Sequence, residues 1–308
     1  MLPRGSIPAP AALVDDSDAG TGGGASVEQS ELSKLLADLR LIVRPLSGAD
    51  RELLIHAIHF YELANLKTII RGKLAGLARD EIEAELFDLG AFATLPMDDL
   101  LRTEDAPEAL RRLETTPYFA IARQARRTYE QGQDMFAVDA AIDRQYLAAL
   151  KHRAQSVSRR ERRAVAAVAG ALMDRTNLVW LLRFRFSYDF APAATYYQLV
   201  PSPASMTAER LRSLARLPSF QDVVDALPEP LTRWVSGASG IAEVEDRLEK
   251  RMESVCDAVL KRQRHPIARA FAYLVRRDLD MRRMIAVIKG LRLGLDADLV
   301  RTAAHLAD

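Results

Sequence analysis

Two carboxylates, Glu62 and Asp174, stand in apolar sequence of helical spacing, and each is followed three residues later by an asparagine. A carboxyl group enclosed by apolar residues can act as a general acid or base, because burial shifts its pKa. Catalysis needs one such site, whereas this pattern recurs along the chain. The recurrence favours a structural role, in which acid and asparagine join a network with a base on a facing helix.

The recurring pattern is acid-x-x-Asn-apolar-x-x-apolar-apolar-Arg-x-basic, and it fits residues 62–73 and 174–185. A third copy starts at Asp280 and keeps the acid, the apolar positions and the base, with Arg283 in the asparagine position. We predict that the polar residues of the three copies form structural networks that fix helix pairing: Glu62, Asn65, Arg71 and Lys73; Asp174, Asn177, Arg183 and Arg185; Asp280, Arg283 and Lys289.

Helices must position these side chains, because after residue 27 apolar residues recur at three- and four-residue spacing almost throughout. Each copy carries an apolar trio at i, i+3 and i+4, which predicts one stripe per helix facing a core. The trios are Leu66, Ile69 and Ile70; Leu178, Leu181 and Leu182; Met284, Val287 and Ile288. The sequence therefore predicts an all-α protein.

One predicted helix is longer than the others. It begins at Ser158, where Glu161 three residues later suggests a capping box, and it runs to about Phe186. Its most apolar stretch, residues 164–173, is half of the roughly 20 residues that a membrane-spanning helix needs. We therefore expect that the chain does not cross a membrane.

The copies divide the chain into three diverged helical units, at residues 28–135, 136–235 and 236–308. The first and third also agree beyond the helix, since Gly76-Leu77 and Gly294-Leu295 fall at the same distance from their acids. Residues 1–27 are rich in Ala, Gly, Pro, Ser and Asp, a composition that buries too little apolar surface to fold. We predict a disordered tail there, without a signal peptide.

The segment from Glu62 to Lys73 resembles the C/d-subunit family of V-type ATPases almost position for position. Members of that family carry three helical units with an acid-x-x-Asn-Leu-(Lys/Arg)-x-Ile-(Ile/Leu)-Arg-x-Lys signature. Residues 277–285 also resemble the family's Arg-Glu-x-Glu-x-x-Asn-Leu-Arg element. The resemblance covers residues 30–308.

The resemblance implies a pseudo-threefold funnel of three units and a non-catalytic role in the central stalk of a rotary ATPase. The implied partners are the D and F proteins of the rotor shaft and the proteolipid ring, which the family couples to each other for ATP-driven proton or sodium transport. The implied location is peripheral, on the cytoplasmic face of the membrane, with membrane contact through the ring alone. No cofactor and no small-molecule substrate are implied.

Composition agrees with a protein-binding role. The 43 basic and 42 acidic residues leave a net charge of +1, so no overall field attracts nucleic acid. No Gly-x-x-x-x-Gly-Lys-Ser/Thr loop is present to bind ATP. The single cysteine, Cys256, lacks a histidine nearby in sequence, which favours an inert thiol over a nucleophile. His56 and His59 lie one turn apart, but the sequence places no third ligand, so we expect no metal site.

Three alternatives remain open from the residues alone. The basic cluster Arg159-Arg160-Glu161-Arg162-Arg163 fits a solvated helix start, a contact with an acidic shaft or stator protein, or a contact with anionic lipid headgroups. The divergent third copy and the unusual N-terminus fit a helical-repeat interaction scaffold that has left the ATPase. The third alternative is an enzyme that uses the Glu62 or Asp174 carboxylate as a general acid or base. This alternative requires those carboxylates to be accessible to a substrate.

Overall fold

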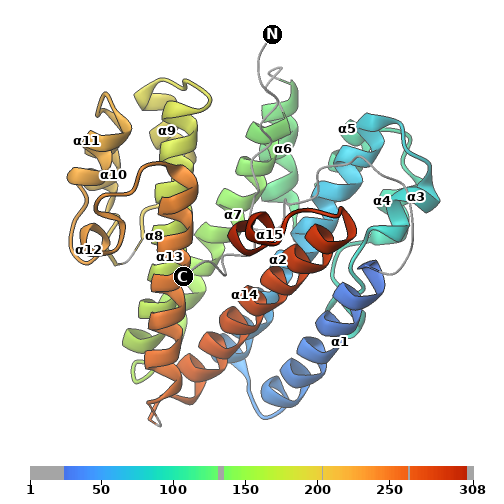
Figure 1. Cartoon of the computed structure of the whole chain (residues 1–308). Coiled ribbons are helices and arrows are strands. Elements are labelled where there is room, and N and C mark those ends of the chain that lie inside the picture. Colours follow the sequence, from blue (N-terminus) through green and yellow to red (C-terminus); the bar gives the residue numbers. More distant parts are fainter. Residues whose placement is uncertain (1–23, 131–134, 203, 263, 304–308) are drawn as a thin grey trace. The chain divides into compact units, whose positions relative to one another are not determined.

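The computed structural model describes residues 24–130, 135–202, 204–262 and 264–303, and every regular element in these ranges is a helix (Figure 1). The predicted all-α fold class is thereby confirmed. By length and apolar composition, one of these helices, α8 (Arg162–Phe186), could cross a membrane, but 83% of its most apolar window is buried inside the protein. Such burial is typical of a core helix.

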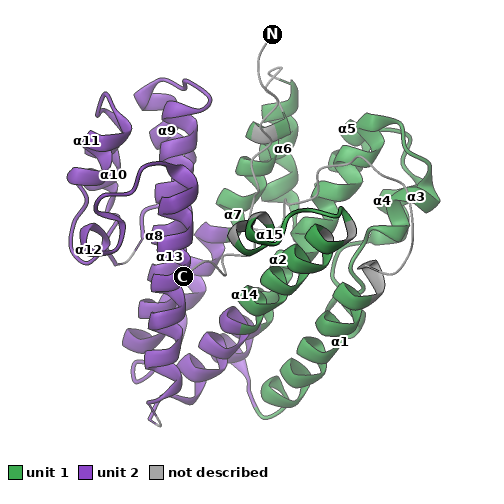
Figure 2. Cartoon of the chain, in the orientation of Figure 1, with its two compact units in different colours: residues 1–45, 55–146, 277–308 green, residues 46–54, 147–276 purple. Residues whose placement is uncertain are grey.

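The chain forms two compact units, coloured separately in Figure 2. Unit 1 takes residues 1–45, 55–146 and 277–308, and unit 2 takes residues 46–54 and 147–276. Three long helices, α2 (Gly48–Ala75), α7 (Met135–Ser156) and α14 (Pro266–Arg292), contribute residues to both units. The boundaries of the predicted units, at residues 135 and 235, therefore differ from the boundaries of the compact units.

Unit 1 combines the C-terminal parts of α2 and α14 and the N-terminal part of α7 with shorter helices. These are α1 (Gly24–Val43), α3 (Arg79–Ala84), the 3-10 helix η1 (Gly90–Phe92), α4 (Met97–Arg102), α5 (Ala106–Leu113), α6 (Phe119–Glu130) and α15 (Ala297–Ala303). The first predicted apolar trio, on α2, lies in its core and is fully buried: Leu66, Ile69 and Ile70.

Unit 2 is built around α8 and α13 (Ile241–Leu260), which pack against each other along their length. The smaller helices are α9 (Pro192–Gln198), α10 (Ala208–Ala215), α11 (Phe220–Asp225) and α12 (Leu231–Val235). The second predicted trio, on α8, is also fully buried: Leu178, Leu181 and Leu182. The third predicted trio, on α14, is half-buried, in contrast to the full burial of the first two: Met284, Val287 and Ile288.

The helix predicted at residues 158–186 is not the longest, because α2 has 28 residues and α14 has 27, against 25 in α8. Its predicted start is also wrong. Helix α8 begins at Arg162 and not at Ser158, although it ends at Phe186 as predicted. The capping box does not form, because the Glu161 carboxylate accepts a hydrogen bond from the backbone N–H of Ala268 at the start of α14. The carboxylate that the local sequence predicts to cap α8 therefore binds a backbone group more than 100 positions away.

The predicted tail boundary needs a similar correction. Residues 24–27 form the first turn of α1, so residue 27 lies inside a helix. Residues 1–23 of the predicted tail lie outside the described part of the chain.

The ends of α2 and α14 have the same structure. Gly76 and Gly294 take positive φ angles of 71° and 61°, which glycine adopts at little cost. The next residue in each case, Leu77 or Leu295, donates to a carbonyl five residues back, as in a Schellman motif. Those carbonyls belong to Gly72 and Gly290, and a Cβ atom on either would lie 2.5 Å from the side chain of Ile82 or Val300, respectively.

Gly170 of α8 permits an equally close approach in unit 2. A Cβ atom on Gly170 would lie 2.6 Å from the Cβ atom of Ala204. We expect Gly170→Ala to lower the free energy of unfolding by about 1–3 kcal/mol through overpacking, measured by urea denaturation. The double variant Gly170→Ala/Ala204→Gly removes the clash and should recover most of the loss. A rise of about 1 kcal/mol in the single variant, as helix propensity alone predicts, would contradict the close approach.

Candidate functional site

The predicted polar residues lie on three long helices. Four are on α2, four on α8 and three on α14: Glu62, Asn65, Arg71 and Lys73; Asp174, Asn177, Arg183 and Arg185; Asp280, Arg283 and Lys289. The contacts of the first two sets are made within unit 1 and within unit 2, respectively. Each residue of the α2 set makes contacts that correspond to those of its counterpart in the α8 set.

The two asparagines of the chain, Asn65 and Asn177, make the same pair of hydrogen bonds. The Asn65 amide nitrogen donates to the carbonyl of Phe87 (2.7 Å), and its oxygen accepts from the N–H of Phe87 (2.8 Å). Asn177 does likewise with Val200, at 2.6 and 2.9 Å. A planar amide offers one donor and one acceptor side by side, so it can bind both polar groups of one backbone residue. Each asparagine therefore fixes the loop that follows the next short helix, α3 in unit 1 and α9 in unit 2.

The acid one turn earlier fixes a second point of the same loop. The Glu62 carboxylate accepts from the backbone N–H groups of Thr94 and Leu95 and from the Tyr118 hydroxyl. The Asp174 carboxylate accepts from the Ser202 hydroxyl and, at 3.3 Å, from the N–H of Met206. Acid and asparagine together anchor the stretch that leads to α4 in unit 1 and to α10 in unit 2.

The bases at the ends of α2 and α8 also correspond. Lys73 donates to the carbonyls of Leu101 and Thr103 at the end of α4. The Arg185 Nε atom donates to the carbonyl of Ala215 at the end of α10 (2.9 Å). Carbonyl groups at a helix C-terminus lack partners within the helix, and a cation there is favourable. These bases thus cap the short helices that follow the anchored loops.

A third set of contacts joins each long helix to a neighbour. Arg71 pairs with Asp139 of α7, and Arg183 pairs with Glu245 of α13 at 2.7 Å. In unit 1 Lys67 pairs with Asp143, one turn further along α7. Long helices in each unit are therefore held by ion pairs as well as by apolar contacts.

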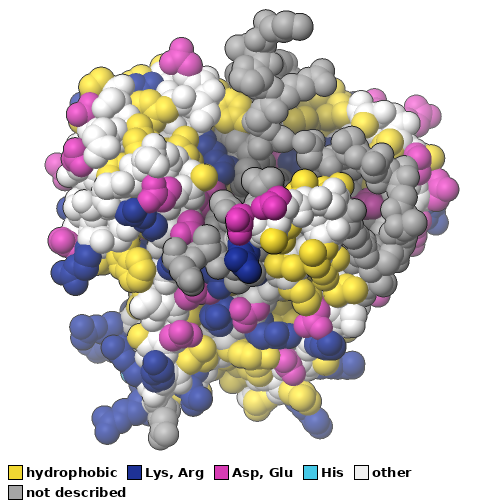
Figure 3. All heavy atoms as spheres, viewed as in Figure 1, with side chains coloured by type: hydrophobic (Ala, Val, Ile, Leu, Met, Phe, Trp, Pro, Cys, Tyr) yellow, Lys and Arg dark blue, Asp and Glu magenta, His cyan; other side chains and the backbone are white. Residues whose placement is uncertain are grey.

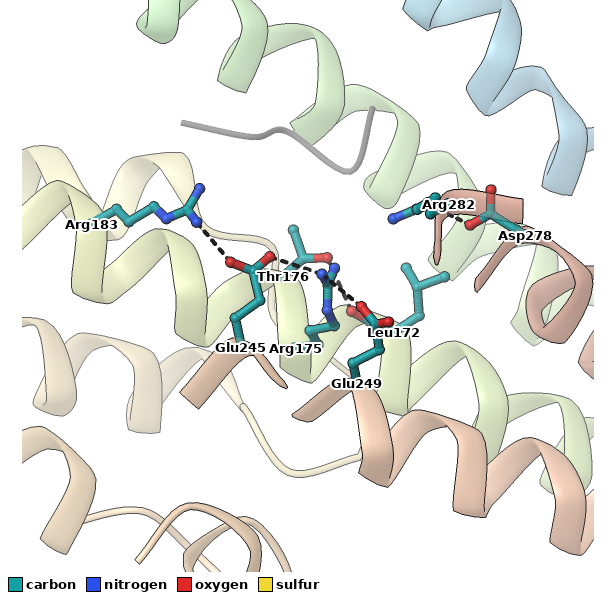
Figure 4. Close-up of polar contacts among 8 residues, drawn as sticks. All are labelled: Leu172, Arg175, Thr176, Arg183, Glu245, Glu249, Asp278 and Arg282. Carbon is teal, nitrogen blue, oxygen red and sulfur yellow. Dashed lines mark hydrogen bonds and ion pairs between the residues drawn. The ribbon is translucent and has the colours of Figure 1, made fainter. Parts of the chain in front are cut away.

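The corresponding contacts in unit 2 form a row along α8 and α13 (Figure 4). The Arg175 guanidinium lies 2.8 Å from one oxygen of Glu245 and 3.5 Å from an oxygen of Glu249. Glu245 thereby lies between Arg175 and Arg183, with one carboxylate oxygen toward each (Figure 4). The row alternates in charge, so each buried ion has an opposite neighbour.

The third predicted set differs. Asp280 and Arg283 are half-buried on α14, and the side chain of Lys289 lies outside the described part. The described contacts of this helix include Asp278, which accepts from the Tyr61 hydroxyl (2.7 Å) and pairs with Arg282. Among the described residues, equivalent contacts of signature residues are therefore established for α2 and α8, and not for α14.

Sequence reasoning missed the partners on the facing helices and three bases. They are Asp139 and Asp143 of α7, Glu245, Glu249 and Arg251 of α13, Lys67 and Arg175. One signal was available. Acid pairs four residues apart occur on both α7 and α13, and they are separated by the same 106 positions as the second and third signatures.

Burial governs the electrostatics of these groups. It raises the pKa values of the Asp143 and Asp174 carboxyls, although Lys67 and the Ser202 hydroxyl oppose the shifts. It lowers the pKa values of Arg183 and Arg251, against the attraction of their acidic partners. Desolvation disfavours every charged form, and the ion pairs offset that cost.

The enclosed carboxylates cannot reach a substrate. Glu62 is 1% exposed and Asp174 is fully buried, and several donors engage each of them. Proton exchange with an external molecule is sterically prevented there. Burial also raises the pKa of Cys256 to about 12, so its thiolate is scarce at neutral pH. His56 contacts the carbonyl of Tyr146 and stacks on its ring, which accounts for its position in the core.

Comparison with known proteins gives consistent matches. Residues 11–303 match the family model described as ATP synthase (C/AC39) subunit. The C subunit of the A-type ATP synthase from Methanocaldococcus jannaschii is 23% identical over 89% of this chain and 70% of its own length. The C subunits of the A-type ATP synthases from Methanosarcina mazei and Haloquadratum walsbyi are 20% and 24% identical, each over 84% of this chain and over 71% and 76% of their own lengths.

We expect Asn65→Ala and Asn177→Ala each to lower the free energy of unfolding by about 2–4 kcal/mol, because each leaves a backbone donor and acceptor unpaired. Chemical denaturation measures this. Gln29→Ala is the matched control, since the Gln29 amide makes the same pair of bonds to Asp88 at an exposed position. Losses for the asparagine variants as small as that of the control would contradict the proposed anchoring.

Arg251 lies 3.4 Å from Asp174, and removing it would leave a buried charge uncompensated. We expect Arg251→Met to cost about 3–5 kcal/mol at pH 8, and Arg251→Met/Asp174→Asn to recover part of this. The cost should shrink as the pH falls. Burial raises the folded-state pKa of Asp174, so protonation below that pKa neutralises the carboxyl and favours the folded state. A pH-independent cost in urea titrations would exclude this explanation.

Proposed function

The chain belongs to the ATP synthase (C/AC39) subunit family, and from this premise we propose that it couples the rotor shaft of an A/V-type ATP synthase to the membrane proteolipid ring. Members of this family are non-catalytic, so the chain is a structural part of the complex. That complex is associated with a membrane, and its other subunits are the partners of this chain.

We further propose the D and F proteins of the shaft and the proteolipid ring as the direct partners, with the chain on the cytoplasmic face of the membrane. In that position it would serve ATP-driven transport of protons or sodium ions. The near-neutral charge of the whole chain and the burial of α8 are compatible with peripheral attachment through other proteins of the complex.

The observation that carries this proposal is the anchoring of loops to long helices by Asn65 and Asn177. A part that transmits torque needs stiffness. Amide clamps, buried ion pairs and close helix packing supply stiffness, because dense interiors transmit strain. The signature residues Glu62, Asn65, Asp174 and Asn177 make the anchoring contacts, and Arg71 and Arg183 of the same signature make ion pairs.

We propose that the signature residues form a structural network repeated in three units, at residues 28–135, 136–235 and 236–308, arranged as a pseudo-threefold funnel. The equivalent contacts of α2 and α8 support two of the units. The equal ends of α2 and α14 relate the third unit to the first.

The proposal predicts what co-purifies with the chain. A tagged chain, extracted from its native membranes with mild detergent, should bring down proteolipid, shaft and catalytic proteins of the ATPase in stoichiometric amounts, identified by mass spectrometry. A variant that unlocks both anchored loops, Asn65→Ala/Asn177→Ala, should recover less shaft and ring, with the untagged wild-type chain as the control for background.

Two outcomes would decide against the coupling role. Recovery of other proteins without any part of the ATPase would favour the interaction scaffold. Recovery of the catalytic head without shaft or ring would place the chain elsewhere in the complex.

A further inference from the structure

Two basic segments lie together at one end of unit 2. The first joins α7 to α8 and enters α8, and the second joins α13 to α14 and enters α14. Together they carry eight exposed basic residues, here called the basic end: Arg159, Arg160, Arg162, Arg163, Lys261, Arg262, Arg264 and Arg269. Figure 3 shows Lys and Arg side chains gathered where α13 and α14 meet, at its lower left.

Glu161 holds the two segments together. One of its carboxylate oxygens accepts from the N–H of Ala268 (3.0 Å), and the other lies 3.9 Å from the His265 ring. Glu161 is 3% exposed, so it contributes a link and little surface charge. The Asp50 carboxylate accepts from the N–H of Ser158 and steadies the first segment further. These contacts fix the backbone of both segments, so the positions from which the eight basic side chains extend are defined by the fold.

Its positive charge is not neutralised within the described chain. None of the eight residues makes a salt bridge to a described acidic residue, and the one acid inside the segments is buried Glu161. Helix stability does not account for Arg159, Arg160, Arg162 and Arg163 either. Cations at the N-terminus of α8 oppose the helix dipole and cost free energy. An external anion would offset this cost.

The surroundings of these residues indicate which kind of anion fits. Protein interfaces are typically centred on apolar and aromatic side chains, and their cores are depleted of charged residues. The exposed large hydrophobic residues of the described chain all lie outside both basic segments. Binding must then rest on charge alone. Clusters of four to eight Lys and Arg residues bind the anionic headgroups of a bilayer in this way, at about 1 kcal/mol per residue.

We propose that the basic end binds an anionic phospholipid surface directly. The chain then has its own electrostatic contact with the membrane, in addition to any contact through other proteins of the complex. Since the contact needs only this chain, it can be tested apart from assembly, and it stands or falls independently of the coupling role.

The test uses the purified full chain and sucrose-loaded vesicles of phosphatidylcholine, with or without about 30 mol% phosphatidylglycerol. We expect sedimentation with the anionic vesicles only, and release as salt rises from about 0.1 M to about 0.5 M, where charges are screened. The variant Arg159→Gln/Arg160→Gln/Arg163→Gln/Arg264→Gln should partition at least about tenfold more weakly.

The matched control removes four exposed arginines of unit 1: Arg40→Gln/Arg111→Gln/Arg112→Gln/Arg123→Gln. It has the same net charge, and it should bind nearly as well as the wild type. Circular dichroism melts show whether either variant remains folded. Equal losses in both variants would mean that net charge alone governs binding and would overturn the proposal. So would binding to neutral vesicles, or a tighter salt-matched affinity for a polyaspartate peptide or a DNA duplex.

Discussion

The structure depends on how polar groups are satisfied in the middle of long apolar helices. A charge or amide buried there costs several kcal/mol unless a partner meets it. Each partner is a backbone group of one particular loop or an opposite charge at one particular height on a facing helix. The Asn177 amide is satisfied only when the N–H and the C=O of Val200 both lie against it. The Glu245 carboxylate is satisfied only at the height on α13 where it lies between Arg175 and Arg183. The polar contacts therefore select one register among many that apolar packing alone would tolerate.

The sequence was sufficient for features that depend on local spacing. Period and propensity predicted the helices, and the apolar trios of α2 and α8 lie in the core. The asparagines were identifiable because their acids stand one turn away. Their partners were not, since Phe87 and Val200 lie in loops whose path depends on tertiary structure. Glu161 shows the limit most clearly. Local sequence predicts a cap for α8, whereas the folded chain uses the carboxylate at α14.

Repetition of contacts explains why the signature tolerates change at some positions. In α2 and α8 the acid changes from Glu62 to Asp174, while the hydroxyl and N–H donors around it change too. Each loop adjusts to the length of its acid. The asparagine does not vary between these two helices, because no other side chain of its size presents a donor and an acceptor to one residue. On α14 the apolar trio is half-buried and Arg283 stands in the position of the asparagine. The side chain at position 283 therefore meets different packing and hydrogen-bonding requirements from Asn65 and Asn177.

The contact that Glu161 makes with the start of α14 also has a mechanical consequence. Helices α8 and α14 are stiff rods, and the carboxylate of Glu161 stands at the first turn of one and accepts from the first turn of the other. Such a link behaves as a pinned joint, in which the ends cannot separate although each rod can still pivot. A twisting force applied to α8 would therefore reach α14 directly through this hydrogen-bonded side chain, without first travelling the length of the intervening chain.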